Sequence, residues 1–227
     1  MKRLYLLLQL DADQRTDCAR DEMLTLLKHH GLTPPFRAAM LDDAVSAGAH
    51  LKREALAGLP DLVISAGVSD AVDVDSLLAA ISALNHDFNA CITQERVVMD
   101  PPIDDNGRIA GSMQLCSFRK IGSLSHDAFM RIWREDHTQV AIDCQSTFGY
   151  RQHEVLEWLR GELNADAIVE EHFPLTALSD PTEMFGAIGD PAAMQSNLKH
   201  IIDSCDRFID KQTVNVIHMS EYQYNES

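Results

Sequence analysis

The hydrophobic and polar positions of the chain form short alternating stretches, typical of strands, and longer stripes with helical spacing. In the first half they predict strands at 3–10, 61–66 and 89–98, helices at 18–30 and 74–84, and a mixed segment at 36–59. Within the mixed segment, we expect an extended piece at 37–41 and some helix through 44–56. The run RLYLLLQL at 3–10 is apolar in both alternating sets, which predicts a strand buried on both faces.

The second half repeats this order after a linker at 100–111, DPPIDDNGRIAG, which is dense in turn residues and has no periodicity. The elements predicted beyond it are strands at 112–119, 147–154, 167–173 and 213–220, a helix at 125–142, a helical piece at 156–163, and helices that start at Asp180-Pro181 and Asp190-Pro191. Both Asp-Pro pairs combine a capping carboxylate with a proline in the first turn, which indicates a helix start.

Each half therefore has the element order β-α-β-β-α-β, the ferredoxin-like arrangement of a four-stranded antiparallel sheet with two helices on one face. The other face of such a sheet needs a partner that buries it. The sequence predicts an α+β fold of two ferredoxin-like repeats, 1–105 and 112–227, packed sheet to sheet as one barrel of the dimeric type. An internal duplication is the simplest origin of this pattern.

Charge and cysteine content narrow the possible functions. With 35 acidic and 19 basic residues the formal net charge is −16, which repels nucleic-acid phosphates and anionic lipid surfaces. No apolar run approaches the roughly 20 residues of a membrane span, and the apolar start has no cleavage site behind it. The 5 cysteines show no CxxC pair, as in a reduced protein. We expect a cytoplasmic protein that binds neither nucleic acid nor membranes.

The helix predicted at 125–142 carries a histidine on its apolar stripe. Ser125 is a suitable cap, and Phe129, Trp133 and His137 follow at intervals of about one turn. A half-buried histidine that only hydrogen-bonds to a backbone carbonyl would explain His137 without any function. The sequence of this helix alone does not decide whether His137 is a functional residue or only a packing residue.

The first half offers an internal comparison for this histidine. When EMLTLLKHHG is aligned with AFMRIWREDH, the apolar positions match and Gly31 stands where the second half has His137. Packing can thus be achieved without the imidazole, which favours a functional His137. Its neighbour Asp136 is a second candidate, or a residue at the rim.

A set of residues within 113–152 stands in a recognisable order: Arg119, Lys120, Gly122, Ser125, Phe129, Trp133, His137 and Tyr150. This order resembles the motif of the EthD family. That motif has a basic pair that ends a strand, a Gly-Ser turn, an aromatic-rich helix that ends in His, and a Tyr on the next strand. This family belongs to the dimeric α+β barrel superfamily. A looser pattern of acidic strand, turn and helix extends the likeness over most of the second half. The first half resembles the family only in its element order.

The resemblance implies a ligand pocket between a sheet and its helices or inside the barrel. Relatives in the superfamily include cofactor-free cyclases, lactone isomerases and monooxygenases, and also haem-binding enzymes. Haem held by His137 of this chain is therefore an alternative, but no other feature of the sequence supports it. Fold analogy leaves the reaction open. We expect a cofactor-independent lyase, isomerase or cyclase that acts on a small apolar carbonyl compound. A non-catalytic carrier or accessory protein is the alternative.

The candidate site consists of three catalytic residues and four ligand-binding residues: His137, Tyr150 and Asp136, then Arg119, Trp133, His153 and His218. An imidazole beside a carboxylate or a phenol can move protons near pH 7, and Arg119 or Lys120 could stabilise an enolate. For any single strand residue, a cross-strand pair or a solvated edge is the preferred explanation. The 10 histidines include no HExxH pattern, and no phosphate-binding glycine loop occurs, so neither a metal nor a cofactor is predicted.

The working pocket is predicted in the second half. Strand 3–10 has no basic pair to match Arg119-Lys120, and its leucine side chains fill space without offering a polar group to a ligand. The first half is therefore expected to act as a structural lid. The expected partner is a small apolar organic ligand, and a homodimer is an open possibility.

Overall fold

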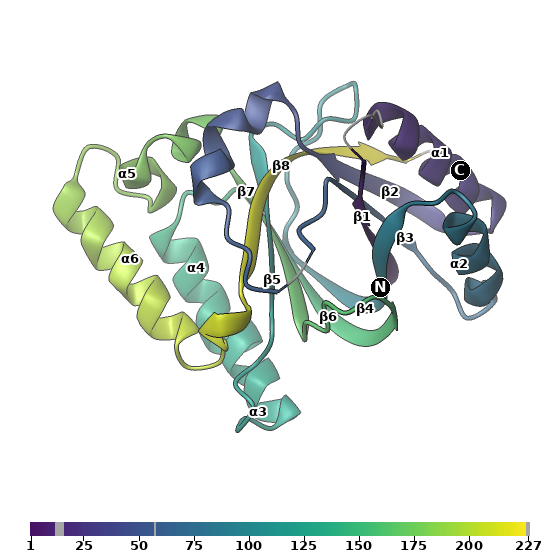
Figure 1. The fold of residues 1–227 in the computed structure, drawn as a ribbon. Helices are drawn as coiled ribbons and strands as arrows, with labels where there is room; N and C mark the ends of the chain where they lie inside the picture. Colours follow the sequence, from purple (N-terminus) through teal and green to yellow (C-terminus); the bar gives the residue numbers. More distant parts are fainter. Residues whose placement is uncertain (12–15, 57, 226–227) are drawn as a thin grey trace.

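The computed structural model describes residues 1–11, 16–56 and 58–225, in which eight strands close into one antiparallel barrel (Figure 1). The strands are β1 (Lys2–Gln9), β2 (Thr33–Met40), β3 (Leu62–Gly67), β4 (Asp87–Met99), β5 (Ser112–Phe118), β6 (Gly149–Arg160), β7 (Ala167–Phe173) and β8 (Asn215–Tyr224). The α-helices are α1 (Thr16–His29), α2 (Val74–Ser82), α3 (His126–Arg131), α4 (Thr138–Cys144), α5 (Pro181–Met184) and α6 (Pro191–Cys205). The shorter helical turns are η1 (Asp43–Leu51), η3 (Leu175–Leu178) and η4 (Lys211–Thr213), which are 3-10 helices, and η2 (Ile132–His137), a π-helix.

The strands are hydrogen-bonded around the barrel in the order β1-β3-β2-β8-β5-β7-β6-β4. The first half contributes the neighbours β4-β1-β3-β2, and the second half contributes β8-β5-β7-β6 in the equivalent order. Two antiparallel seams, β2 with β8 and β4 with β6, join the halves. The predicted α+β barrel is confirmed.

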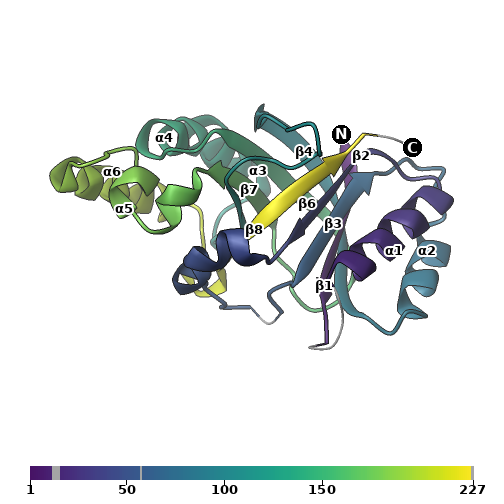
Figure 2. The same ribbon diagram turned by 90° about the horizontal axis from the view of Figure 1, so that it is seen from above.

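Helices cover the barrel on two opposite sides, as Figures 1 and 2 show. α1 and α2 lie over the first half, where the outward side chains of Leu4, Leu6 and Leu8 are completely buried beneath them. Gly31 follows α1 with a φ of +80°, a conformation that favours glycine just after a helix. The residue aligned with His137 therefore ends a helix. Among the described residues, no helix combines the length and apolar character needed to cross a membrane.

The inside of the barrel contains a buried group of charged and polar side chains, which we call the interior ion network: Arg3, Arg37, Arg151, Glu95, Glu170, Glu221, His153, His172 and Tyr5. Arg151 Nη1 donates to Glu170 Oε2 and to Glu221 Oε1, both at 2.8 Å. Arg37 pairs with Glu95, and His172 pairs with Glu221. Both halves contribute, and three arginines balance three glutamates, so the network joins the halves by charge as well as by hydrogen-bonded strands.

The prediction of a helical piece at 156–163 is wrong, because β6 continues as a strand to Arg160. Trp158 and Arg160 pair with Cys91 and Ala90 of β4. The pairing of β4 with β6 shifts register at several points, and each shift interrupts the simple alternation of faces. The sequence of this stretch consequently lacks the two-residue alternation of apolar and polar positions by which a strand is recognised.

The helix predicted at 125–142 is present but contains an inserted π turn, η2, between α3 and α4. Thr138 Oγ1 donates to the carbonyl oxygen of Trp133 at 3.2 Å within this region. The wider turn accommodates an extra residue, so that Trp133, His137 and Thr138 are all buried against the sheet. Such insertions occur often at functional sites, and this one lies where the sequence motif places its histidine.

Candidate functional site

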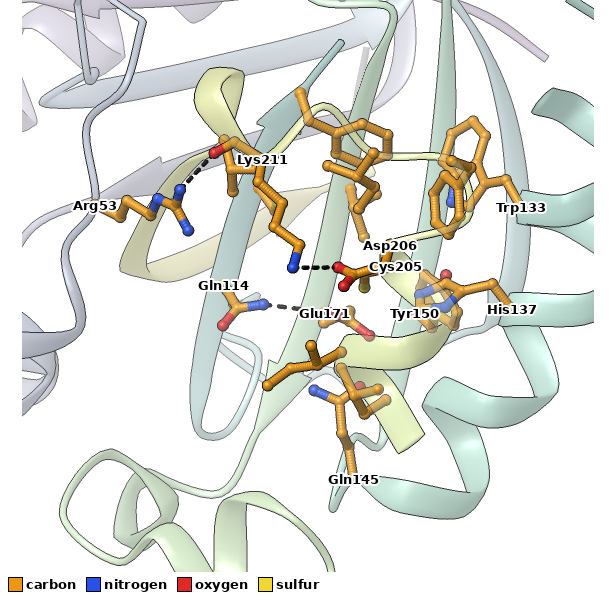
Figure 3. A pocket seen from close by; sticks show the side chains of 18 residues that line it. Arg53, Gln114, Trp133, His137, Gln145, Tyr150, Glu171, Cys205, Asp206 and Lys211 are labelled. Carbon is orange, nitrogen blue, oxygen red and sulfur yellow. Dashed lines mark hydrogen bonds and ion pairs between the residues drawn. The ribbon is translucent and has the colours of Figure 1, made fainter. Parts of the chain in front are cut away.

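A cavity of about 390 Å³ lies between the outer face of the second-half strands and the helices that cover them (Figure 3). Its apolar lining consists of aromatic, aliphatic and thiol side chains: Cys116, Phe118, Trp133, Val169, Ile201, Ile202, Cys205, Phe208, Ile209 and Val214. Its polar lining is smaller: Arg53, Gln114, His137, Gln145, Tyr150, Glu171, Asp206 and Lys211. A mostly apolar pocket of this volume with a few converging polar groups is typical of small-molecule sites.

Four polar side chains form a row across the outer face of the sheet. Register pairs His218 on β8 with Gln114 on β5, Gln114 with Glu171 on β7, and Glu171 with Tyr150 on β6. Directly paired residues on neighbouring strands present their side chains to the same face at close range. The row therefore brings a carboxyl, a phenol, an amide and an imidazole to one surface.

Glu171 is the ionisable group most suited to proton transfer. Its side chain lines the cavity and is only 7% exposed. Burial raises the pKa of the carboxyl from 4.5 to about 7. Gln114 Nε2 donates to Glu171 Oε2 at 3.3 Å. The Gln114 amide is neutral, so it supplies no charge to compensate that of the carboxylate. A carboxyl with a pKa near neutral pH exchanges a proton readily under ordinary conditions.

Tyr150 stands beside Glu171 and remains a phenol. Burial, together with the nearby Glu171 charge, raises the pKa of Tyr150 well above its usual value. Gln152 Nε2 donates to the Tyr150 hydroxyl oxygen at 2.9 Å. The phenol can therefore serve as a hydrogen-bond donor to an oxygen placed next to Glu171.

His137 lies at the end of the π turn and is 8% exposed. Its Nδ1 is 2.9 Å from Ser204 Oγ on α6, and its ring meets Phe208 edge-on with the centroids 4.9 Å apart. Burial, and secondarily the positive charge of Arg207, lowers the pKa of His137 to about 4. The imidazole is thus neutral at pH 7, and its partner is a side-chain hydroxyl, not the backbone carbonyl of the non-functional interpretation.

Charged groups line one side of the cavity (Figure 3). Lys211 Nζ is 2.5 Å from Asp206 Oδ1, and the Arg53 guanidinium donates to the carbonyl oxygen of Lys211. Arg53 belongs to the first half of the chain, and its backbone pairs with Val216 of β8 in the second half. A segment of the first half consequently forms part of the wall of the second-half cavity.

The structure brings together three of the predicted residues, because Trp133, His137 and Tyr150 all line this cavity. The other four lie elsewhere. Asp136 is exposed and pairs with Arg207 at 2.6 Å. Arg119 Nε donates to the Asn164 carbonyl oxygen at 2.9 Å, beyond the end of β5.

His153 and His218 lie on opposite faces of the sheet. His153 points into the barrel, where its Nε2 is 2.9 Å from the Tyr5 hydroxyl oxygen, so the sheet separates it from the cavity. His218 is on the cavity face but lines a second, neighbouring cavity. Sequence alone had not decided which face of each strand looks inward.

Glu171 and Gln114 were missed by the sequence-based prediction. A signal was present, because the strand AIVEEHF holds two adjacent glutamates inside an otherwise apolar run. Adjacent residues of a strand point to opposite faces, so one carboxyl had to enter each buried layer. In the structure Glu170 joins the interior ion network and Glu171 enters the cavity.

The described residues contain no group of three or more His, Cys, Asp or Glu side chains placed to hold a metal ion. The barrel and its cavity define an α+β barrel protein with a pocket the size of a small organic molecule. No protein-family model matches the chain, and no curated protein matches its sequence. The EthD resemblance therefore stays a prediction.

Solved structures resemble this chain at very low sequence identity, and one with a TM-score above 0.5 shows a shared fold. An anthrone oxidase-like protein superimposes with a TM-score of 0.57 at 7% identity, covering 98% of this chain and 91% of that one. A candidate monooxygenase from Fusobacterium nucleatum subsp. nucleatum gives a TM-score of 0.47 at 9% identity, with coverages of 98% and 91%. A candidate chlorite dismutase gives 0.47 at 12%, with coverages of 98% and 94%. At identities this low, the likeness concerns the fold alone.

Proposed function

We propose that the protein is a cofactor-independent enzyme that moves a proton on a small, largely apolar carbonyl compound, as a lyase, isomerase or cyclase does. The observation that carries the proposal is Glu171, a buried carboxyl with a pKa of about 7 that faces an apolar cavity beside a phenol. Perturbed pKa values of this kind concentrate at catalytic sites. A carrier of apolar ligands would gain nothing from a carboxyl that costs folding energy at neutral pH.

The chemistry assigned to the site is the removal of a proton from a carbon next to the carbonyl group. The Glu171 carboxylate accepts this proton, the C–H electron pair forms the enolate double bond, and the charge moves to the carbonyl oxygen. The Tyr150 hydroxyl donates a hydrogen bond to that oxygen, where negative charge develops. Return of the proton at another position completes an isomerisation.

The cavity wall suits an aromatic or polycyclic ketone. Trp133, Phe118 and Phe208 present flat apolar surfaces to the ligand. The fold relative is named for an oxidase of anthrone, which is an aromatic ketone with an acidic C–H, and this agrees with the same substrate class. His137, neutral and oriented by Ser204, would contact the ligand without supplying charge.

We further propose that the barrel arose by duplication of a ferredoxin-like unit, with repeats at 1–105 and 112–227 and an EthD-like second repeat. The equivalent strand order of the two halves supports this history. The first repeat has filled its own equivalent face with leucine and contributes Arg53 to the wall of the other site. One working pocket in the second repeat is the result.

The direct test is deuterium exchange into 1-tetralone, a bicyclic aromatic ketone, followed by NMR in D2O. We expect the wild-type protein to accelerate exchange at the carbon next to the carbonyl. Tyr150→Phe should lower that rate by roughly 100-fold, because it removes the hydrogen bond to the developing oxyanion. Binding of 1-tetralone without any acceleration of exchange would identify a carrier instead of an enzyme.

Replacing His137 with glutamine separates a ligand-contacting role from a packing role. We expect His137→Gln to weaken 1-tetralone binding by up to about tenfold, which corresponds to the loss of one net hydrogen bond. Calorimetric titration measures the affinity, and thermal unfolding measures stability in the same samples. Lower stability with unchanged affinity would assign His137 to the core.

A further inference from the structure

A second cavity of about 220 Å³ lies next to the first along the outer face of the sheet. Gln114 and Gln145 line both cavities, so the two volumes meet at these amide side chains, both visible in Figure 3. The wall of the second cavity is also mainly apolar, with Leu51, Ala177 and Phe185 among its residues. The side chains that the two cavities share are therefore uncharged.

His218 supplies the second cavity with an imidazole that has only one of its two nitrogens paired among the described residues. The residue is 4% exposed, and its Nδ1 is 3.3 Å from Ser112 Oγ. Its Nε2 is buried and has no hydrogen-bond partner among the described residues. An unpartnered buried nitrogen has an energetic cost, which a ligand atom placed in this cavity would offset.

First-half residues cover this second cavity. His50 and Leu51, at the end of η1, form part of its wall. At Gly48 the η1 backbone approaches closely, because a Cβ there would lie 3.1 Å from His218 Cβ and 3.1 Å from Leu178 Cδ2. A segment of the other half of the chain therefore forms part of the wall of this cavity.

We infer that the two cavities form one binding site with two chambers, and that the substrate is an elongated molecule whose far end carries a hydroxyl or carbonyl group that binds His218 Nε2. This inference rests on the proposed function, since it names the substrate class of the same site. The polar row from Tyr150 to His218 spans three strand spacings, or roughly 14 Å. The reacting carbonyl lies between Tyr150 and Glu171, and the molecule extends past Gln114 and Gln145.

The test compares two ketones that share the reacting part. 1-Tetralone fills the first chamber only, whereas 6-(4-hydroxyphenyl)-1-tetralone adds a phenol at the end remote from the carbonyl. We expect the wild-type protein to bind the longer ketone more tightly in calorimetric titrations. His218→Phe keeps the ring but removes both nitrogens, and it should reduce the preference for the longer ketone by about tenfold.

Two further variants complete the experiment. Ala177→Leu narrows the second chamber and should also reduce the preference for the longer ketone, while His86→Phe, a buried histidine remote from both chambers, should leave it unchanged. A preference that survives both His218→Phe and Ala177→Leu would overturn the two-chamber inference and leave the proposed function standing. If the wild type accelerated deuterium exchange into neither ketone, the proposed function would be contradicted. The ratio of the affinities for the two ketones would still decide the two-chamber inference.

Discussion

Glu171→Gln is expected to abolish most of the proton-transfer activity and, at the same time, to stabilise the protein above neutral pH. Glutamine keeps the shape of the side chain and can still accept the hydrogen bond from Gln114, but it cannot take a proton from carbon. Loss of a general base lowers rates by roughly 100- to 10,000-fold. Deuterium exchange into 1-tetralone measures this change.

The stability effect follows from the raised pKa of Glu171. Between pH 4.5 and 7 the folded protein retains a proton that the unfolded chain has released, so stability falls as the pH rises through this window. The full cost, about 3 kcal/mol, is present above pH 7. Glu171→Gln removes this cost, so the variant should be more stable than the wild type at pH 8 by up to about 3 kcal/mol. Below pH 4.5 the two proteins should be equally stable.

Urea unfolding at pH 4.5 and pH 8 measures both values. Glu157→Gln is the matched control, because Glu157 is exposed on β6 of the same sheet and should change neither activity nor the pH dependence of stability. If Glu171→Gln kept full exchange activity, Glu171 would not be the base. If it failed to stabilise the protein at pH 8, the carboxyl would be ionised at little cost.

Arg151→Met is expected to destabilise the protein by about 3 to 5 kcal/mol, the usual effect of removing one partner from a buried ion pair. Arg151 is fully buried inside the barrel and holds both Glu170 and Glu221. Methionine fills a similar length but leaves two carboxylates without their shared cation. Chemical denaturation at pH 7 gives the free energy of unfolding.

Acid should weaken the same network in the wild type. Burial would raise the pKa of Glu170, but its interactions with His153 and Arg151 outweigh burial and hold the pKa well below the usual value. The stabilisation is therefore complete above the unfolded pKa near 4.5 and is lost as the pH falls below it.

Arg207→Met is the control for Arg151→Met, because it removes only an exposed pair with Asp136 and should cost at most about 1 kcal/mol of stability. Equal losses of stability from Arg151→Met and Arg207→Met would mean that the interior ion network contributes no more than a surface pair.

The fold was largely predictable because most strands of the barrel carry the apolar patterns expected of buried strands. In β1, Leu4, Leu6 and Leu8 face the helices, while Tyr5 and Leu7 face the barrel interior. The prediction failed for 156–160, where the pairing of β4 with β6 shifts register and the alternation is lost. Register shifts depend on the partner strand, which the local sequence does not specify.

The candidate site was predictable where a single helix determines it. Trp133 and His137 share a helical face, so their common position in the cavity follows from spacing. His153 and Glu171 depended instead on which sheet face meets the helices. That choice is made by the packing of the whole barrel, because ionisable residues occupy both faces: Glu170 lies inside and Glu171 lies in the cavity.

The position of β8 in the ring determines when the protein can complete its fold during synthesis. β8 bridges β5 and β2, so it is the strand that connects the two halves at one seam. It also carries Glu221, one of the two carboxylates that hold Arg151. Until the ribosome has released this strand, the sheet has two open edges and a cation without one of its partners. We therefore expect the nascent chain to depend on chaperones until β8 emerges, and chains truncated before Asn215 to aggregate.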